Sequence, residues 1–85
     1  MTTTIHLGTD ADKVARALRA IATASVDRRL RGAAAVCAGR MRRAMDRREV
    51  QRVVWLLQTA RRDTSLPRAE RRAAVYWSAH LRARI

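Results

Sequence analysis

The stretch DRREVQRVVWLLQTA, residues 46–60, decides how this chain folds. Its apolar side chains recur at intervals of three and four residues, which is the period of a helix with one buried side. That side carries Val50, Val53, Val54, Leu57 and Ala60. Asp46 and Glu49 stand at the start, where carboxylates bind free amide groups and complement the helix dipole. We therefore predict an amphipathic helix over residues 46–62, which either starts at Asp46 or continues the helix before it.

Helical periodicity extends over most of the remaining chain. Residues 10–25 place on one side Val14, Leu18, Ile21, Ala22 and Ser25. Residues 27–45 likewise have an apolar side, with Leu30, Ala34, Cys37, Met41 and Met45. Val26, just before this helix, is a candidate apolar staple. The only proline, Pro67, begins a last helix over 67–84, whose inward side carries Leu66, Ala69, Ala73, Tyr76, Trp77, His80 and Leu81. The predicted fold class is all-α, a compact bundle of about four short helices over residues 10–25, 27–45, 46–62 and 67–84.

Residues 1–9 differ from the rest of the chain. The segment Thr2–Thr9 is rich in β-branched residues, alternates in polarity and closes on Gly8, so it predicts a short strand or an extended arm. A single strand is not stable alone. It must pair with a copy of itself, dock on the helices or stay mobile. We assign residues 1–9 as an extended arm and residues 10–85 as a single helical domain.

An extended segment followed by two helices is similar to the order of elements in ribbon-helix-helix repressors, whose paired strands enter the DNA major groove. The similarity covers residues 2–45 and rests on Thr4-Ile-His-Leu7, the apolar stripe of residues 10–25 and Val26. Residues 22–25, Ala-Thr-Ala-Ser, stand where the family has a glycine turn, and Leu30 is out of step with its core pattern. The resemblance is one of topology, and no residue role is transferred from it.

Large apolar residues are scarce in this chain. The hydrophobic fraction is 48%, but 17 of those residues are alanine, and Leu, Ile and Val together make up only 20% of the 85 residues. A domain of this size buries only ~60% of the surface of its unfolded chain, so such a core is marginal alone. We expect a homodimer or another partner to supply the missing burial.

Positive charge is the second dominant feature. Nineteen Lys or Arg residues against seven Asp or Glu give a net charge of +12 at pH 7. Small soluble domains keep a net charge of roughly 2–8 in magnitude, and a larger excess repels itself unless a polyanion neutralises it. Arginine pairs such as Arg47-Arg48 wrap the charge around each helix, because neighbours diverge by about 100°. This favours sequence-tolerant contact with phosphates over the reading of individual bases.

Six of the seven acids have structural explanations. Six fall at predicted helix starts: Asp10, Asp12, Asp27, Asp46, Glu49 and Glu70. Only Asp63, in the predicted loop before Pro67, has no such role. No carboxylate pair is left for acid–base chemistry, and the sequence has no activated nucleophile, metal-ligand set or glycine-rich phosphate loop. We therefore predict no enzyme activity, no catalytic residue, no cofactor and no metal.

Cys37 and His80 fit this assignment. Cys37 lies on an apolar stripe and is predicted to be a buried, inert thiol. One cysteine without a matching set of ligands cannot form a structural zinc site. His80 lies on the inward side of its helix and is predicted to be structural.

Two basic surfaces are the candidate binding sites. On residues 46–62, Trp55 points away from the apolar stripe in the company of Arg48, Gln51, Arg52, Thr59 and Arg62. An indole among guanidinium groups suits stacking on a base or anchoring a partner protein. The alternative is that Trp55 packs against the N-terminal arm or another helix, with the arginines as its solvated rim.

The second surface is the outward side of residues 67–84, with Arg68, Arg71, Arg72, Val75, Ser78 and Arg82. Its first positions lie near a helix N-terminus, which attracts phosphate, and a helix of this kind suits the DNA major groove. The turn before it, residues 62–66, has no glycine, so the helix-turn-helix pattern is incomplete. The alternative is an ordinary solvated side.

Gly32 and Gly39 lie on one side of the helix predicted over residues 27–45. Each glycine costs ~1 kcal/mol against alanine within a helix. We expect them to allow the close approach of another helix, so that residues 27–45 pack on two sides. A phosphate backbone lying across the smooth strip is the alternative.

Two function classes follow. The first is a small basic nucleic-acid-binding protein, with DNA as the favoured partner, that acts as a regulator or accessory factor through arginine–phosphate contacts. The second is an adaptor or inhibitor that docks its Trp55-containing surface on an acidic patch of a larger protein. The site residues in either class are Arg48, Arg52, Trp55, Arg62, Arg68, Arg71, Arg72 and Arg82. We expect a cytoplasmic location, in the nucleoid if the partner is DNA, and no membrane partner.

Overall fold

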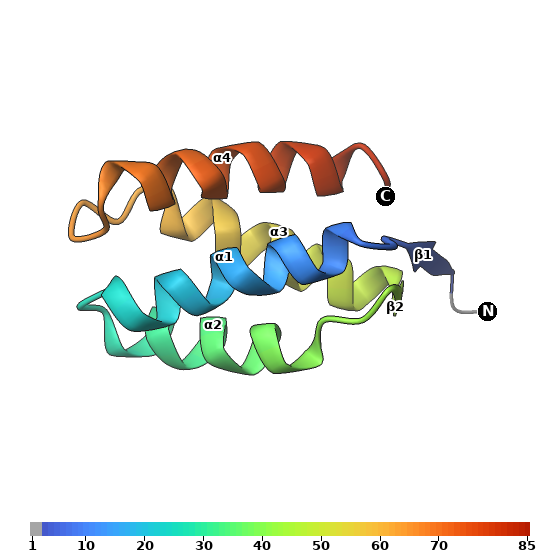
Figure 1. The fold of residues 1–85 in the computed structure, drawn as a ribbon, viewed down its shortest axis with the longest axis horizontal. Helices are drawn as coiled ribbons and strands as arrows, with labels where there is room; N and C mark the ends of the chain where they lie inside the picture. Colours follow the sequence, from blue (N-terminus) through green and yellow to red (C-terminus); the bar gives the residue numbers. More distant parts are fainter. Residues whose placement is uncertain (1–2) are drawn as a thin grey trace.

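The computed structural model describes residues 3–85, which form four helices and a two-stranded antiparallel sheet (Figure 1). The helices are α1 (Asp10–Ala24), α2 (Arg28–Arg40), α3 (Arg47–Ala60) and α4 (Arg68–Arg82), and the strands are β1 (Thr4–His6) and β2 (Ala44–Asp46). The predicted all-α bundle is confirmed. Met1 and Thr2 of the predicted arm lie outside the described residues.

Successive helices run in opposite directions, so their connections alternate between the two ends of the bundle (Figure 1). α1 packs most extensively against α2, and α3 against α4, while smaller contacts join α1 to α4 and α2 to α3. The helices therefore form a ring in which α1 and α3 are diagonal to each other. As a result, the outward sides of α1 and α3 belong to opposite faces of a body that measures 38 × 20 × 19 Å.

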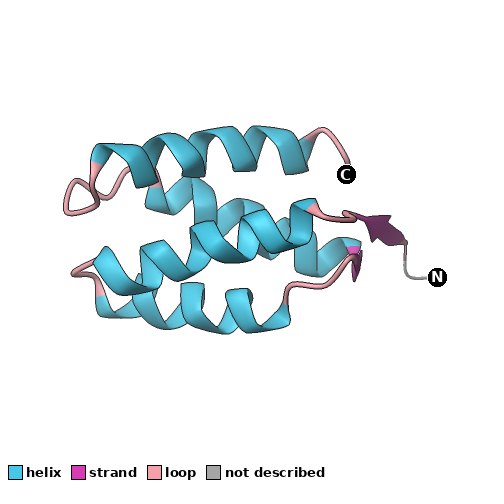
Figure 2. Cartoon of the chain, in the orientation of Figure 1, coloured by secondary structure: helices cyan, strands magenta, loops and turns pink. Residues whose placement is uncertain are grey.

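Strand β1 pairs with β2 of the same chain, at the end of the bundle that holds both termini (Figure 2). Ile5 lies opposite Met45, and both side chains are buried. Beyond the strand, the amides of Leu7 and Gly8 both donate to the carbonyl of Arg43, at 2.6 and 3.1 Å. Gly8, with a φ of 58°, then turns the chain into α1 through a conformation that favours glycine.

The segment docks on the helices, as one of its predicted fates required, since Ile5 and Leu7 are buried in the core. Its strand partner was not predicted, because residues 44–46 had been assigned mostly to a helix. In ribbon-helix-helix repressors the paired strands come from two chains. Here both strands belong to one chain, so the resemblance does not extend to an intermolecular ribbon.

The predicted helix over residues 27–45 is wrong at its C-terminal end. α2 ends at Arg40, and Met41 already has extended backbone angles. Met41 and Met45 have helical spacing, but the backbone of β1 needs hydrogen-bonding partners, and residues 43–46 provide them. Met45 reaches the core from β2, with 2% of its surface exposed. α2 and α3 are therefore separate helices.

Two aspartates fix the starts of the helices, as predicted. The Asp27 carboxylate accepts hydrogen bonds from two amides of the first turn of α2, at 3.0 and 3.3 Å. The Asp46 carboxylate accepts one from the amide of Arg48 at 3.0 Å. Glu49, the other acid at this helix start, does not bind a free amide, because its carboxylate turns to Arg42 at 3.1 Å.

The core runs along the centre of the bundle and is built from small and medium side chains. The predicted stripes of α1 and α3 are buried, except that Ala22 is only partly buried, and Leu56 joins them. Six of its buried residues are alanines: Ala11, Ala15, Ala34, Ala38, Ala60 and Ala74. Within residues 3–85, no helix combines the length and the apolar character needed to cross a bilayer.

The inward side predicted for α4 is only partly right: Leu66 and Leu81 are buried and Trp77 packs against the core, but the buried side as a whole is rotated by about one residue step, or about 100°. The residues that α4 buries are Ala74, Ser78 and Leu81, whereas Tyr76 is 59% exposed. Ser78, which we had placed outward, is buried and donates its hydroxyl to the carbonyl of Val75 at 3.0 Å. Small residues let α4 approach α3 closely, so the larger aromatic side chains lie at the margin.

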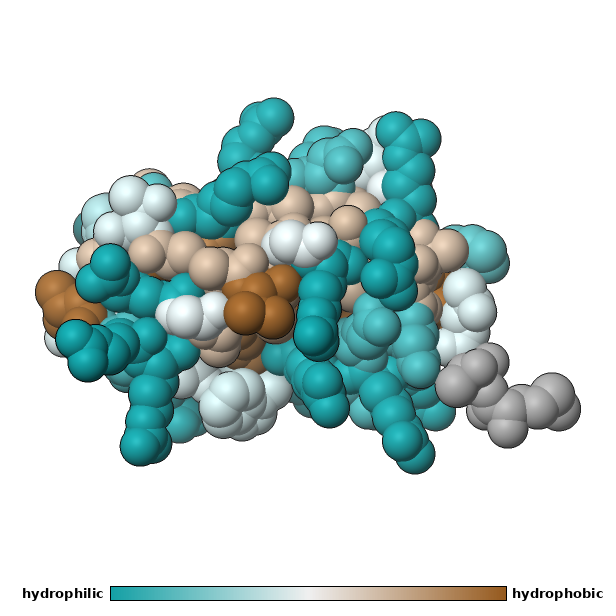
Figure 3. All heavy atoms as spheres, turned by 90° about the horizontal axis from the view of Figure 1, so that it is seen from below, coloured by the Kyte–Doolittle hydropathy of each residue, from teal (hydrophilic) through white to brown (hydrophobic). Residues whose placement is uncertain are grey.

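The expectation that α2 packs on two sides is also wrong. Gly32 and Gly39 are exposed, and a β-carbon added at either would meet nothing within 4 Å. Val36, on the same helix, is 54% exposed, and Val26 is 78% exposed instead of packing as a staple. Figure 3 views the molecule from the side of α2, where neutral and apolar atoms form a strip among projecting hydrophilic side chains.

The packing of the N-terminal segment makes a prediction about stability. Leu7 is 3% exposed, whereas Thr4 of the same segment is exposed. Leu7→Ala should lower the free energy of unfolding by about 3 kcal/mol, because it leaves a cavity in the core. Thr4→Ala, the matched control, should change it by less than about 0.5 kcal/mol. Urea unfolding followed by circular dichroism measures both, and equally small effects would contradict the packing.

Candidate nucleic-acid interface

The predicted site residues fall into two groups in the structure. Arg48, Arg52 and Trp55 of α3 border one surface together with Arg82 of α4. Arg62, Arg68 and Arg72 are exposed around the connection from α3 to α4, near the opposite end of the bundle. The first group, with Gln51, is named the Trp55 face and consists of Arg48, Gln51, Arg52, Trp55 and Arg82. The second group is named the loop-end cluster.

The exposure of Trp55 follows from the way α3 packs. α3 buries its apolar stripe against the other elements, so the opposite side of the helix faces outward. Trp55 is 66% exposed. The alternative prediction, in which the indole packs against the N-terminal segment or another helix, is therefore wrong.

Two shallow hollows border the indole. One, of about 400 Å³, is lined by Arg48, Gln51, Arg52 and Trp55. The other, of about 440 Å³, is formed by α3 and the C-terminal end of the chain, and is lined by Gln51, Val54, Trp55, Gln58, Arg82 and Ile85. Gln51 and Trp55 line both hollows, so the indole stands between two surfaces that a flat group can approach.

The cations of this face have no carboxylate partner within residues 3–85. Of the nineteen Lys and Arg side chains, seventeen are exposed, and only Arg42, Arg43 and Arg84 form ion pairs with carboxylates in the described chain. Arg40 of α2 lies beside Arg52, because both border the hollow next to Cys37. The basic surface thus continues from α2 across α3 to α4.

Arg71 belongs to neither group, which corrects its assignment to the outward side of α4. Its side chain is half-buried, and its Nε is buried with no hydrogen-bond partner among the described residues. Its charge acts on Asp63 and helps to lower the pKa of that carboxyl group. Arg71 is therefore less accessible than Arg68, Arg72 and Arg82 of the same helix, and it lies near the loop network described next.

Asp63 has a structural role that the sequence did not reveal. It accepts a hydrogen bond from the hydroxyl of buried Ser25 at 2.6 Å, and others from the amide and hydroxyl of Ser65. Ser65 in turn accepts from the amide of Val26 at 3.2 Å. These bonds fasten the α1–α2 connection to the α3–α4 connection. The same bonds, from Ser25 first and then Ser65, hold the pKa of Asp63 below its ordinary value.

A second polar cluster fastens the other end of the bundle. Arg84 donates to the Asp10 carboxylate at 2.6 Å and to the carbonyls of His6 and Leu7 at 3.2 and 3.3 Å. His80 Nε2 lies 3.1 Å from the same Asp10 oxygen. The contact with His80, aided by Arg84, lowers the pKa of Asp10. The prediction that His80 is structural agrees with this geometry.

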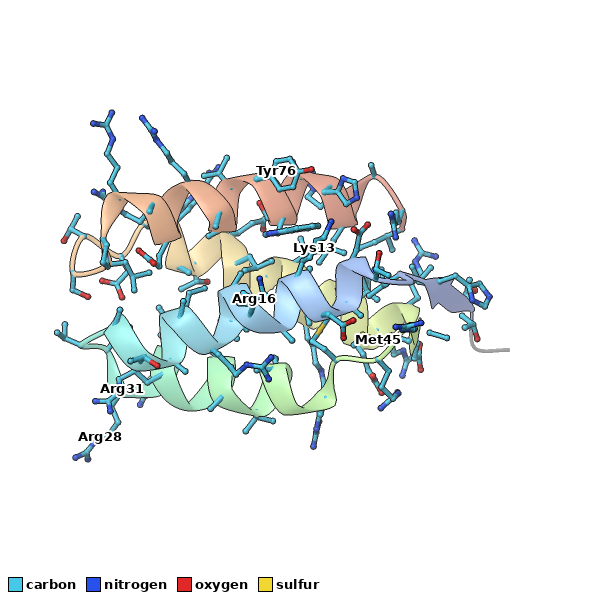
Figure 4. The ribbon with its side chains drawn as sticks, viewed as in Figure 1. Lys13, Arg16, Arg28, Arg31, Met45 and Tyr76 are labelled. Carbon is cyan, nitrogen blue, oxygen red and sulfur yellow. The ribbon has the colours of Figure 1, made fainter. Side chains whose placement is uncertain are left out.

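Tyr76 is an exposed aromatic residue that the sequence argument had placed inside. Its ring stacks on that of His80, with centroids 5.7 Å apart and planes 12° apart. Figure 4 shows Tyr76 on α4 and Lys13 and Arg16 on α1, which is the helix diagonal to α3. Tyr76 therefore lies on a different face from Trp55, with a similar degree of exposure.

Cys37 is partly buried, and burial raises the pKa of its thiol. A protonated thiol is a poor nucleophile and a poor metal ligand. Among residues 3–85, no three His, Cys, Asp or Glu side chains gather in a way that could hold a metal ion.

Comparisons with known protein families, with curated proteins and with solved structures found no match for this chain.

The Asp63 network makes a prediction about pH. Because the folded state lowers the pKa of Asp63, its stabilising contribution is complete above the ordinary pKa of 3.8 and is lost as the pH falls through the lowered value. Asp63→Asn should cost about 1 kcal/mol at pH 7, a modest value for a partly exposed network. It should also flatten the loss of stability between about pH 5 and about pH 2.

Urea unfolding at a series of pH values measures this effect. Asp12→Asn is the matched control, because Asp12 is exposed and its one ion pair, with Arg43, is long at 3.9 Å. Coincident stability curves for the wild type and Asp63→Asn would show that the Asp63 hydrogen bonds contribute nothing to the fold.

Proposed function

We propose that this protein is a small nucleic-acid-binding protein that holds its ligand by arginine–phosphate contacts, as a regulator or accessory factor. The observation that carries the proposal is the Trp55 face, where three exposed arginines without carboxylate partners in residues 3–85 surround an exposed indole. Phosphate backbones supply the regular negative charge that such a surface needs, and they release counterions when they bind it. DNA is the favoured ligand class.

The arrangement supports sequence-tolerant binding. Helix-turn-helix proteins join two crossing helices by a turn of three or four residues. Here residues 61–67 connect α3 and α4, and the two helices pack side by side in opposite directions. The arginines of the Trp55 face come from two helices and border open hollows, which suits contact with a backbone better than insertion of one helix into a groove.

A second candidate function is an adaptor or inhibitor that docks on an acidic protein surface. The observation that favours it is the outer side of α2, where Gly32 and Gly39 leave a smooth exposed strip beside Val36. Another helix could approach this strip closely, although α2 has no such neighbour within residues 3–85. The predicted homodimer would use the same strip or the Trp55 face.

The salt dependence of binding tests the first candidate. Fluorescence anisotropy of a labelled random-sequence DNA duplex, from about 50 to about 200 mM salt, should show affinity that falls by two decades or more. Removing three phosphate contacts with Arg48→Ala, Arg52→Ala and Arg82→Ala in one chain should flatten the slope of log K against log salt concentration by about three.

Two charge-matched triple variants serve as controls. One removes the α1 cations Lys13, Arg16 and Arg19, which lie on the opposite face, and it should keep the wild-type slope. The other removes the loop-end cluster, Arg62, Arg68 and Arg72, and shows whether that end of the bundle also contacts phosphate. Equal flattening by the α1 variant would remove the Trp55 face from the proposal. No binding of this duplex or of a single-stranded oligonucleotide, even at about 50 mM salt, would refute nucleic-acid binding and favour the protein partner.

A further inference from the structure

The geometry points to a narrower ligand for the same face: the Trp55 face binds unpaired nucleobases, so a single-stranded segment is preferred over a duplex. This inference rests on the proposed function, because it assumes that nucleic acid is the ligand. It goes further by assigning a stacking role to Trp55 and a base-contacting role to the glutamines beside it.

Trp55 is exposed to a degree that the fold does not require. The indole is 66% exposed on the outward side of α3, where it is the largest apolar group. Tyr76, the other strongly exposed aromatic residue in the described chain, has one ring face stacked on His80. Trp55 has no aromatic partner among residues 3–85, so its ring remains available to a ligand.

The surroundings of Trp55 suit a base on either side of the indole. The hollows of about 400 and about 440 Å³ share Gln51 and Trp55 as lining residues. They are open depressions, and a flat ring can lie in one against the indole without being enclosed. Stacking of this kind tolerates any base, because every base has a π-face.

The polar groups around the indole match the rest of a nucleotide. Gln51 and Gln58 line the larger hollow and offer amide donors and acceptors to the edge of a base. Arg48 and Arg52 border the smaller hollow, and Arg82 borders the larger one. Cations on both sides of a stacked base would follow the phosphates of a strand that crosses the indole.

A duplex fits this arrangement less well. Its bases are stacked on one another, so their faces can reach a protruding indole only after unstacking. A single strand presents its base faces at little cost. The same exposed side chain therefore favours unpaired bases, whereas the arginines alone would attract either form.

Binding of matched oligonucleotides tests the inference. The probes are labelled dT15, labelled U15 and a labelled 15-base-pair random duplex, each at about 100 mM salt. We expect one of the single strands to bind the wild-type protein about tenfold more tightly than the duplex. Whether dT15 or U15 binds more tightly identifies the source of the unpaired bases, and either result supports the inference.

Trp55→Leu separates stacking from charge. It should weaken single-strand binding about tenfold, leave duplex binding within about twofold and leave the salt slope unchanged, because no phosphate contact is lost. Tyr76→Leu is the matched control, since Tyr76 is 59% exposed on a different face, and it should leave all three quantities unchanged. Both variants should melt cooperatively, because the substituted side chains lie largely outside the core.

Fluorescence gives a second readout that does not depend on a mutation at the site. In a Trp77→Phe chain, Trp55 is the only tryptophan, and a base stacked on it should quench its emission as dT15 or U15 is added. Unchanged emission on saturation with a bound single strand would overturn the stacking role.

The outcomes also separate this inference from the proposed function. If duplex and single strands bind equally, with the expected salt dependence, and Trp55→Leu changes neither, then the single-strand inference fails while nucleic-acid binding stands. If none of the three probes binds, the proposed function itself fails.

Discussion

The scarcity of carboxylates is the constraint on which the rest of this structure depends. Six of the seven acids make structural contacts: Asp27 and Asp46 cap helices, Asp10 and Asp63 fasten the two ends of the bundle, and Asp12 and Glu49 pair with arginines. Glu70 lies in the first turn of α4, where it complements the helix dipole. The acids are therefore committed to the fold, and most of the nineteen cations have no partner within residues 3–85. The excess charge of +12 appears on the surface.

Because the core contains few large apolar side chains, these polar contacts matter more for the stability of the fold. The buried side chains include many alanines, and alanine contributes little burial in itself. The bundle compensates by close helix packing and by fastening both ends: the Ser25–Asp63–Ser65 bonds at one end, and the β1–β2 pair with Asp10 and Arg84 at the other. Both fastenings join segments far apart in the sequence. The few acids that could pair with surface arginines are thus mostly used in contacts that hold the fold together.

Much of the fold could be predicted from periodicity, but contacts between distant segments could not. The stripes of α1 and α3 were predicted because strong apolar residues recur at helical spacing there. The end of α2 was not predicted, because Met41 and Met45 also have the spacing of a helix. The strand forms there because residues 44–46 pair with the backbone of β1, about forty residues earlier in the chain. The side that α4 buries was misassigned because aromatic residues outweighed Ala74 and Ser78 in the pattern.

Part of the candidate site could also be predicted from the sequence, and part could not. The outward position of Trp55 followed from the wheel of α3, since the opposite side is so clearly apolar. Arg82 lies beside Trp55 because α4 packs antiparallel on α3, and a single sequence does not specify this packing. Arg71 was assigned to the binding surface because its position looked outward. Its proximity to Asp63 depends on a loop conformation that ordinary residue patterns do not predict.

The most direct test of this account is the melting temperature of the protein as a function of salt, alone and with an excess of dT15. If unneutralised charge is the dominant surface feature, the melting temperature of the free protein should rise with salt, because salt screens self-repulsion. The oligonucleotide should raise it further at low salt, with an increment that shrinks as salt weakens binding. A melting temperature that is independent of salt and of dT15 would contradict the account.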